Sequence, residues 1–336
     1  MKTSSILFSA CVCLALAAET SFAQTVAVGT CRPRLTSYST ISAAVAAVTP
    51  GSTILVCPGA YPESPTITTP LTLQGLTSEA GVRTVYVQSI SVPGTGPVNI
   101  RNVVVGQGLT SGGGIVYLGS GGTVEGVDVR SGGISALGLG VSHISSLTVV
   151  NSSVIGNVSA NGTVEASSEL NLTNNWISGG LDYGDAGGLV QGNTIVTTGI
   201  GIVLGDGAGP DVAPTINGNT IVGATYGITF GGGITGSGVT ITNNHFISNG
   251  TGIAPSQYAT ETTTIEGNTF IQSSVAAIDF GNCNDGVTHN IKENTFVGAP
   301  VGIEGVDRFA VLVGNNFYNV TSPTSTCTGE SAGSRK

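Results

Sequence analysis

The sequence predicts an all-β solenoid, a right-handed parallel β-helix with three sheets and roughly ten coils, closed at its N-terminal end by a short helix. Three observations lead to this fold class: 52 glycines in the chain, a charged fraction of only 9%, and a hydrophobic repeat with a period of about 25 residues. The small number of charges excludes a coiled coil, a helical bundle and a disordered polyelectrolyte. Ser, Thr and Asn supply polarity instead, and they suit strands and turns.

The repeat is clearest in the second half of the chain. Asn followed by Thr or His and then by a large apolar residue stands at positions 193, 219, 244, 268 and 294, at intervals of 26, 25, 24 and 26. Asn175-Trp176-Ile177 and Asn316-Phe317-Tyr318 extend the series at its two ends. An apolar residue lies three or four positions before each Asn, and another lies nine or ten positions after it. Each period therefore holds three short strands, joined by one tight turn and two longer connections.

A period of this length with three strands distinguishes between repeat architectures. A propeller blade needs four strands in about 40–45 residues, and a leucine-rich repeat needs a regular Leu spacing that this sequence lacks. A parallel β-helix fits, because each coil adds one strand to each of three sheets and like residues stack about 4.8 Å apart. The Asn of each tight turn is predicted to be structural, since its amide bonds to turn peptides and to its stacked neighbour.

The repeat also predicts the domain organisation. The same period continues upstream with less regularity, so residues 66–320 predict one elongated β-helix and not two globular domains. Both ends of such a stack need caps, because they expose apolar core and strand edges. Residues 24–65 are predicted to form the N-terminal cap, with a helix at residues 40–48 that places Ile41, Ala44, Val45 and Val48 on one face. Residues 321–336 are predicted to form a C-terminal cap or tail.

The segment 1–23 is typical of an export signal. Lys2 supplies a positive charge, residues 6–18 are apolar, and Ser21-Phe22-Ala23 is a small-x-small cleavage site. About 13 apolar residues are too few for a membrane span, which needs about 20. We therefore expect a protein that is secreted or periplasmic after cleavage, without a membrane span.

Four cysteines remain after this cleavage, namely Cys31, Cys57, Cys283 and Cys327. An even number in an exported chain indicates disulfides, for which three connectivities are possible. Proximity in the sequence favours Cys31–Cys57 and Cys283–Cys327. A zinc site is disfavoured, because Cys-x-x-Cys spacing with nearby His is lacking.

Several segments resemble the opening of a known superfamily. They are 38–41 (Tyr-Ser-Thr-Ile), 51–56 (Gly-Ser-Thr-Ile-Leu-Val), 58–63 (Pro-Gly-Ala-Tyr-Pro-Glu) and 71–75 (Leu-Thr-Leu-Gln-Gly), and the later Gly-Asn-Thr-Ile coils resemble its generic repeat. The superfamily is that of the pectin-lyase-like right-handed parallel β-helix proteins, which includes pectate lyases, pectin methylesterases and copper-enzyme maturation proteins. The resemblance implies a right-handed fold with a groove along one parallel sheet and the long loops after it. The catalytic motifs of polygalacturonases, pectate lyases and pectin methylesterases do not match, so no catalytic set transfers.

The sheet implied by this resemblance follows the Asn turn by nine or ten positions. Its inward residues are Ile, so the next residue of each strand points to solvent. The outward series is Val203, Thr229, Ala254, Asp279 and Glu304. Two carboxylates therefore fall on adjacent coils, and Asp279, Glu304 and Arg308 are the candidate catalytic residues. Stacked like charges are destabilising unless they share a proton, a cation or a base.

The loops that follow this sheet add further candidates. Calcium is the expected cofactor, because it prefers oxygen ligands such as carboxylates. The candidate ligands are Asp279, Asp285 and Glu304. Tyr258, His289 and Asp307 are candidate substrate-binding residues. Two simpler interpretations compete with these roles. In the first, Arg308 neutralises Asp307 and Glu304 in a surface network. In the second, His289 is a packed histidine, because it lies two positions before an inward Ile and is expected to point the same way.

These features together predict an exported β-helix that binds an extracellular polysaccharide, and they leave open whether it also cleaves it as a lyase or a glycoside hydrolase. The alternative is a non-catalytic solenoid that serves as a surface spacer or an adhesive face. Binding of ice or a mineral by rows of Thr is a third, less favoured interpretation. The formal charge of −9 and a pI near 4.6, without any cluster of Lys and Arg, exclude a nucleic-acid partner. The protein is expected to be a monomer.

Overall fold

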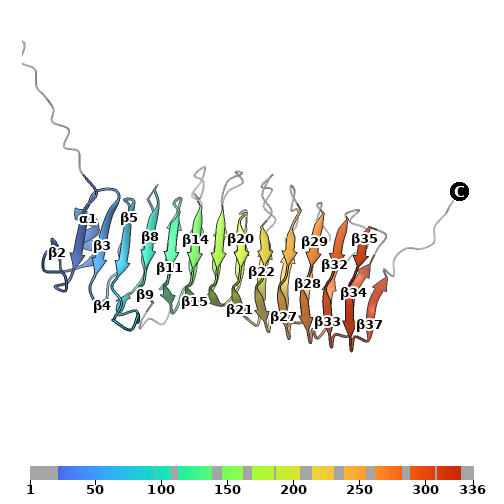
Figure 1. Ribbon diagram of the computed structural model, residues 1–336. Coiled ribbons are helices and arrows are strands. Elements are labelled where there is room, and N and C mark those ends of the chain that lie inside the picture. Colours follow the sequence, from blue (N-terminus) through green and yellow to red (C-terminus); the bar gives the residue numbers. More distant parts are fainter. Residues whose placement is uncertain are drawn as a thin grey trace, which may run out of the picture.

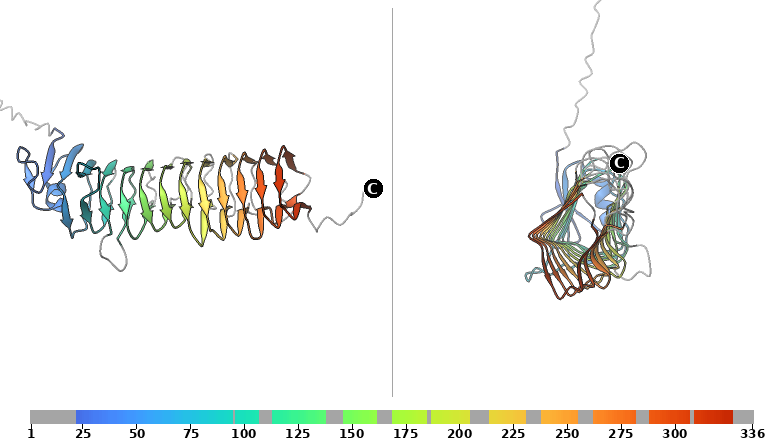
Figure 2. Two further views of the ribbon diagram at one scale, coloured as in Figure 1. Left: turned by 60° about the horizontal axis from the view of Figure 1, so that its bottom comes forward. Right: turned by 90° about the vertical axis from the view of Figure 1, so that its right-hand side faces the viewer.

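The protein is a rod built from three parallel β-sheets, as the sequence predicts (Figure 1, Figure 2). The computed structural model describes residues 22–94, 96–106, 113–137, 146–161, 169–184, 187–204, 214–230, 238–254, 262–281, 288–306 and 309–326. In each regular coil a strand of sheet A leads through a tight turn to sheet B, then to sheet C, and then through a longer connection back to sheet A. The chain advances by one strand in each sheet per coil.

Sheet A has 14 strands and includes the strands of the N-terminal cap. In spatial order they are β2 (Ser37–Tyr38), β1 (Thr25–Val28), β3 (Ser52–Val56), β5 (Leu71–Gly75), β8 (Val98–Arg101), β11 (Gly122–Glu125), β14 (Leu147–Val150), β17 (Leu170–Thr173), β20 (Leu189–Gln191), β23 (Thr215–Asn217), β26 (Thr240–Thr242), β29 (Thr263–Glu266), β32 (His289–Lys292) and β35 (Ala310–Val313).

Sheet B has 12 strands and follows the tight turns. They are β4 (Gly59–Tyr61), β6 (Val85–Val87), β9 (Val104–Val105), β12 (Asp128–Val129), β15 (Ser153–Ile155), β18 (Trp176–Ser178), β21 (Thr194–Val196), β24 (Thr220–Val222), β27 (His245–Ile247), β30 (Thr269–Ile271), β33 (Thr295–Val297) and β36 (Asn316–Tyr318).

Sheet C has 11 strands and carries the outward row with the two paired carboxylates. They are β7 (Ile90–Val92), β10 (Ile115–Leu118), β13 (Ile134–Leu137), β16 (Val158–Asn161), β19 (Leu181–Tyr183), β22 (Ile200–Leu204), β25 (Tyr226–Phe230), β28 (Thr251–Ala254), β31 (Ala276–Asp279), β34 (Val301–Val306) and β37 (Ser322–Thr326).

The core is a set of stacked apolar rows. Ile216, Ile241 and Ile265 pair in register along sheet A, and each is fully buried while its neighbours in the strand are more exposed. Stacked Phe rings form another row under sheet B, with centroids 4.7 Å apart between Phe246 and Phe270 and 5.1 Å apart between Phe270 and Phe296. Alternating burial follows from the two-residue period of a strand, which turns one face of each sheet inward.

The Asn of the tight turns form a continuous hydrogen-bonded ladder, which confirms the predicted structural role. Asn268 is fully buried, and its Oδ1 accepts hydrogen bonds from the backbone N–H and the Nδ2 of Asn244 at 2.8 and 3.0 Å. Its own Nδ2 donates to the backbone oxygen of Ile241 and to Oδ1 of Asn294. The same contacts recur from Asn175 to the last coil.

One position of the ladder differs from the prediction. The sequence series places Asn316 in the ladder of the last coil. Asn316 instead pairs with Thr295 and is exposed. Asn315 takes the ladder position, because its Oδ1 accepts from the backbone N–H of Asn294 at 3.0 Å. The reason is that the last Asn-Asn pair offers two registers, and the stacking of Phe317 on Phe296 selects one of them.

The N-terminal end is closed by helix α1 (Ile41–Ala47), as predicted. Its N-cap Thr40 accepts a hydrogen bond from the backbone N–H of Ala43, and Ile41, Ala44 and Val45 are buried. The carboxylate of Glu63 accepts from the N–H of Ile41 at 2.7 Å. These contacts satisfy backbone donors of the first turn, which a helix cannot satisfy itself.

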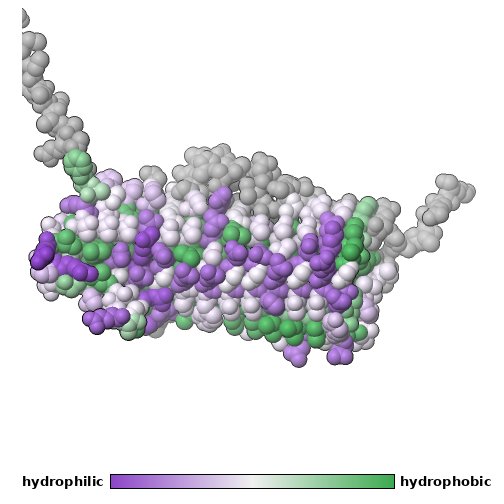
Figure 3. All heavy atoms as spheres, viewed as in Figure 1, coloured by the Kyte–Doolittle hydropathy of each residue, from purple (hydrophilic) through white to green (hydrophobic). Residues whose placement is uncertain are grey.

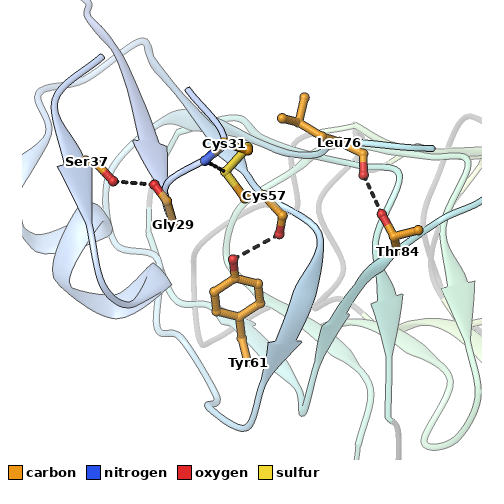
Figure 4. Close-up of a disulfide and its surroundings, with 7 residues drawn as sticks. All are labelled: Gly29, Cys31, Ser37, Cys57, Tyr61, Leu76 and Thr84. Carbon is orange, nitrogen blue, oxygen red and sulfur yellow. Dashed lines mark hydrogen bonds between the residues drawn. A yellow bond between two sulfur atoms is a disulfide. The ribbon is translucent and has the colours of Figure 1, made fainter. Parts of the chain in front are cut away.

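A disulfide fixes the segment beside this cap. Cys31 and Cys57 are bonded, which confirms the first predicted pair, and the Tyr61 hydroxyl donates to the backbone oxygen of Cys57 at 2.9 Å (Figure 4). Cys283 and Cys327 lie outside the described residues, so the second pair stays a prediction. Among the helices of the described part of the chain, none is long and apolar enough to cross a membrane.

Candidate functional site

The outward row of sheet C has the register that the sequence predicts. Val203 pairs with Thr229, and Thr229 pairs with Ala254. Asp279 on β31 pairs with Glu304 on β34, so the two acidic residues occupy the same position on neighbouring strands. The residues before them are fully buried Ile, whereas both acidic residues are half-buried and face outward.

Local structure holds the first of these carboxylates. Oδ1 of Asp279 accepts a hydrogen bond from the backbone N–H of Gly281 at 2.8 Å. Gly281 has a φ of 61°, in the left-handed region that suits Gly, so the chain turns away directly after the strand. Neighbouring strands are about 4.8 Å apart, and two unshielded charges at about 5 Å repel by roughly 1–3 kcal/mol at effective dielectric constants of 80 to 20. A cation or a shared proton at this position would remove the repulsion.

The structure adds a carboxylate to the row that the sequence series did not include. Asp182 on β19 pairs with Val203 and faces outward, four strands from Asp279. Burial raises the pKa of Asp182 above its usual range. The sequence contained a signal for this residue, because Leu181 precedes it as Ile precedes the other members of the row. The signal was weak, since the two Asn that bracket this coil are only 18 positions apart and the coil is shorter than the repeat.

His289 lies inside the protein and not on its surface. It is the first residue of β32, its side chain is 3% exposed, and its ring centroid lies 4.5 Å from that of Phe280. The structure therefore gives His289 a packing contact in the core, which agrees with the interpretation of this residue as a packed histidine. Contact of His289 with a substrate stays a prediction.

Four of the predicted site residues, Tyr258, Asp285, Asp307 and Arg308, lie outside the described residues. The structure brings Asp279 and Glu304 together and does not test the contacts of the other four. Within the described ranges, no group of three or more His, Cys, Asp and Glu side chains is arranged to hold a metal ion. The predicted calcium site includes Asp285, so its three ligands stay a prediction.

The charge of the protein is distributed unevenly along its coils. From β7 onward, the sheet C strands and the connections that lead from them to the next sheet A strand hold one basic residue, Arg308. The same segments hold eleven acidic residues: Glu165, Glu169, Asp182, Asp185, Asp206, Asp211, Glu261, Asp279, Asp285, Glu304 and Asp307. The rest of the chain is nearly balanced, with eight acidic and nine basic residues. These segments therefore account for the whole net negative charge of the chain.

Outside these segments, two ion pairs join opposite charges of the described residues, Arg101 with Glu125 and Arg130 with Asp128. On the outer face of sheet A, Arg101 and Glu125 lie on adjacent strands with Nε and Oε2 3.1 Å apart. Glu266 and Lys292, of opposite charge, occupy facing positions on β29 and β32. Paired surface charges of this kind contribute little to stability, but they cancel one another's field. The excess of acidic over basic residues therefore belongs to the sheet C strands and the connections after them.

A cavity lies at the other end of the rod from the two paired carboxylates. It has a volume of about 410 Å³, and its lining includes Ser42 and Val45 of α1 with Ser64, Thr66 and Thr68 of the facing segment. Its lining residues carry hydroxyl and apolar groups but no charge. It is separate from the acidic row.

Comparison with family models gives a match over part of the chain. Residues 212–332, about a third of the chain, match the model of a family described as periplasmic copper-binding protein (NosD). A search of curated protein sequences gives no match.

Solved structures give the fold. A mannuronic acid specific polysaccharide family 6 lyase from human gut microbiota is 12% identical with a TM-score of 0.56, over 88% of this chain and 86% of that one. The A-module of a mannuronan C-5 epimerase from Azotobacter vinelandii is 14% identical with a TM-score of 0.44, over 83% and 88% of the two chains. A hyperthermoactive exopolygalacturonase from Thermotoga maritima is 11% identical with a TM-score of 0.42, over 81% and 79%. The fold is that of the pectin-lyase-like right-handed parallel β-helix proteins, as the sequence resemblance implies.

Proposed function

We propose that this protein binds an extracellular polysaccharide along the outer face of sheet C. The observation that carries the proposal is the position of Asp279 and Glu304, side by side and outward on adjacent strands. Two stacked like charges destabilise the sheet that bears them unless a partner compensates for their repulsion. The structurally similar family 6 lyase acts on a polysaccharide, which supports a glycan as that partner.

The chemistry available to the pair is that of two neighbouring carboxyl groups. One carboxyl, in its protonated form, would give its proton to the glycosidic oxygen as that bond breaks, while the other, as a carboxylate, would attack the anomeric carbon, and water would then release the sugar from the carboxylate. Carboxyl groups about 5–5.5 Å apart are typical of retaining glycosidases, and adjacent strands of one sheet give a separation of this order. Product analysis decides between binding alone and binding with cleavage.

The uneven charge distribution restricts the ligand. A polyanionic glycan approaching sheet C meets the unbalanced negative charge of its strands and connections and is repelled, whereas an uncharged glycan is not. Calcium would change this outcome, because carboxylate oxygens are its preferred ligands and a bound divalent cation bridges acidic groups of protein and polymer. Asp279 and Glu304 would contribute ligands, and the predicted third ligand is Asp285.

Copper, which the description of the matching family names, has no group of ligands among the described residues, where Cys31 and Cys57 are joined in a disulfide. Copper sites in proteins use imidazole, thiolate and thioether ligands. The chain has one Met, at position 1, and three His. Of the His in the described ranges, His245 is exposed on sheet B, whereas His289 is buried at the start of a sheet A strand. We therefore assign no role to copper.

Export to the periplasm or the medium is part of the proposal. The N-terminal pattern, the Cys31–Cys57 disulfide and the periplasmic family description support it. N-terminal sequencing of protein secreted by an expressing cell tests it directly. A chain that begins at Gln24 supports export with cleavage, and a chain that retains Lys2 contradicts it.

A panel of soluble oligosaccharides tests the function itself. The panel contains neutral, amino-sugar and uronic-acid oligomers, each titrated with and without calcium and analysed for shortened products. We expect binding of neutral oligomers without calcium and of uronic-acid oligomers only with it. Product formation adds catalysis to binding. Absence of binding to every member of the panel would contradict the proposal and favour the alternative of a non-catalytic structural solenoid.

A further inference from the structure

The outer face of sheet B has a composition unlike the other two. Each strand from β15 to β36 contributes two outward positions, which form two parallel rows along the rod. The first row is mostly hydroxyl-bearing: Ser153, Trp176, Thr194, Thr220, His245, Thr269, Thr295 and Asn316. The second is mostly aliphatic: Ile155, Ser178, Val196, Val222, Ile247, Ile271, Val297 and Tyr318. Hydrophobic side chains gather along the lower edge of the rod, where Figure 1 places β27 and β33 (Figure 3).

This face carries no charged group. None of the eight strands from β15 to β36 contains Asp, Glu, Lys or Arg, although the chain as a whole has a formal charge of −9. Charged residues are the usual means of keeping an exposed sheet soluble. An uncharged outer face over eight consecutive coils therefore has a composition suited to contact with an uncharged partner.

Exposed aromatic side chains are placed regularly on the same face. Trp176 on β18 is 42% exposed, His245 on β27 is exposed, and Tyr318 on β36 is 56% exposed. Two strands separate β18 from β27, and two more separate β27 from β36, so each ring lies three strands from the next. Trp176 and His245 belong to the first row, and Tyr318 belongs to the second. At about 4.8 Å per strand the rings recur every roughly 14 Å along the rod.

We propose that the outer face of sheet B is a second docking surface, whose occupant is the flat face of an insoluble, uncharged polysaccharide. A sugar ring presents its C–H groups on one face, and this apolar face stacks on Trp, Tyr and His rings. The hydroxyls of the Thr row then meet the polar edges of the sugars, and the Val and Ile row covers the remaining apolar surface. The solenoid presents the Thr row and the aliphatic row once per coil along the rod. A polysaccharide, whose sugars also repeat regularly, can therefore make the same contacts many times.

Two other occupants fit the observations less well. A lipid surface would leave the Thr hydroxyls of the first row without polar partners, which is costly. A second copy of this chain would bury the aliphatic row, but it would not use the three-strand spacing of the aromatic rings. The experiment includes both as outcomes. The proposal concerns a different face from Asp279 and Glu304 and does not depend on the function proposed for them.

Co-sedimentation with microcrystalline cellulose and with chitin powder tests the proposal. The mature protein is mixed with increasing amounts of each solid, at low and high salt, and the fraction left in the supernatant is measured. We expect the protein to be retained by at least one solid and retention to be insensitive to salt, because no charge takes part. The Trp176→Ala/Tyr318→Ala variant is expected to bind at least about tenfold more weakly, as truncation of aromatic anchors at interfaces does.

Matched variants separate this face from the others. Val311→Ala removes an exposed apolar side chain from sheet A, where Val311 is 41% exposed, and is expected to change nothing. Glu266→Gln, which removes a carboxylate from the same sheet A, is likewise expected to keep full retention. Retention equal in parent and aromatic variant would overturn the proposal, as would a parent that stays in solution. Light scattering that shows a dimer dissociated by the aromatic substitutions, or sedimentation with neutral lipid vesicles, would assign the face to another occupant and overturn it too.

Discussion

Asn268→Ala tests whether the Asn ladder supplies stability to the solenoid. The side chain of Asn268 is fully buried and takes part in five hydrogen bonds, to Asn244 twice, Ile241, Glu266 and Asn294. Truncation leaves the backbone N–H of Asn244 and the backbone oxygen of Ile241 without these partners in a dry interior. Each buried group left unsatisfied costs about 1–3 kcal/mol, so we expect the two groups to lower the unfolding free energy by about 2–6 kcal/mol.

Urea unfolding followed by circular dichroism measures this loss, and Asn316→Ala is the matched control. Asn316 also follows a tight turn, but it is exposed, and its side chain makes one long contact of 3.4 Å to the backbone oxygen of Gly314. The control is expected to change the unfolding free energy by less than about 0.5 kcal/mol. Equal unfolding midpoints for Asn268→Ala and Asn316→Ala would refute the structural account of the ladder.

Three further predictions concern titration and the disulfide. Because burial raises the pKa of Asp182, stability falls as the pH rises from its unfolded to its folded pKa. Asp182→Asn should therefore stabilise the protein at neutral pH and have no effect below that range, as thermal melts across pH will show. Burial also raises the pKa of Tyr117 and Tyr183, so an ultraviolet titration should show both phenols ionising only as the protein unfolds, and early ionisation of all tyrosines would contradict their burial. Reducing Cys31–Cys57, whose sequence separation is 26, should cost about 3–4 kcal/mol, and an unchanged melt under reducing conditions would argue against a stabilising bond.

The repeat makes most of the fold predictable from sequence. A period of about 25 residues with an inward Ile at a constant offset from each Asn defines both the sheets and their register. The sequence therefore places Asp279 and Glu304 on adjacent strands, as the structure has them. The capping helix is predictable for a similar reason, since Thr40 begins an isolated stretch with helical spacing of apolar residues. Each coil repeats the same physical constraints, so one well-defined coil predicts its neighbours.

Features outside the repeat are less predictable. Asp182 lies in a short coil whose interval departs from the period, so its outward position on sheet C does not follow from counting. The choice between Asn315 and Asn316 depends on the packing of Phe317, which is a tertiary contact. The outer face of sheet B becomes visible only when the strands are aligned, because its aromatic residues are far apart in the sequence and three strands apart in space.

The most direct test of the central claim is a calorimetric titration of the oligosaccharide that the panel identifies into three proteins. They are the parent, the Asp279→Asn/Glu304→Gln variant of sheet C, and the Glu266→Gln variant of sheet A, which removes one carboxylate from a strand face of the same solenoid. The account predicts that the sheet C variant keeps or gains thermal stability and loses most of its binding, whereas Glu266→Gln binds like the parent. Identical isotherms for all three proteins would contradict it and would place glycan binding, if any is observed, away from the paired carboxylates.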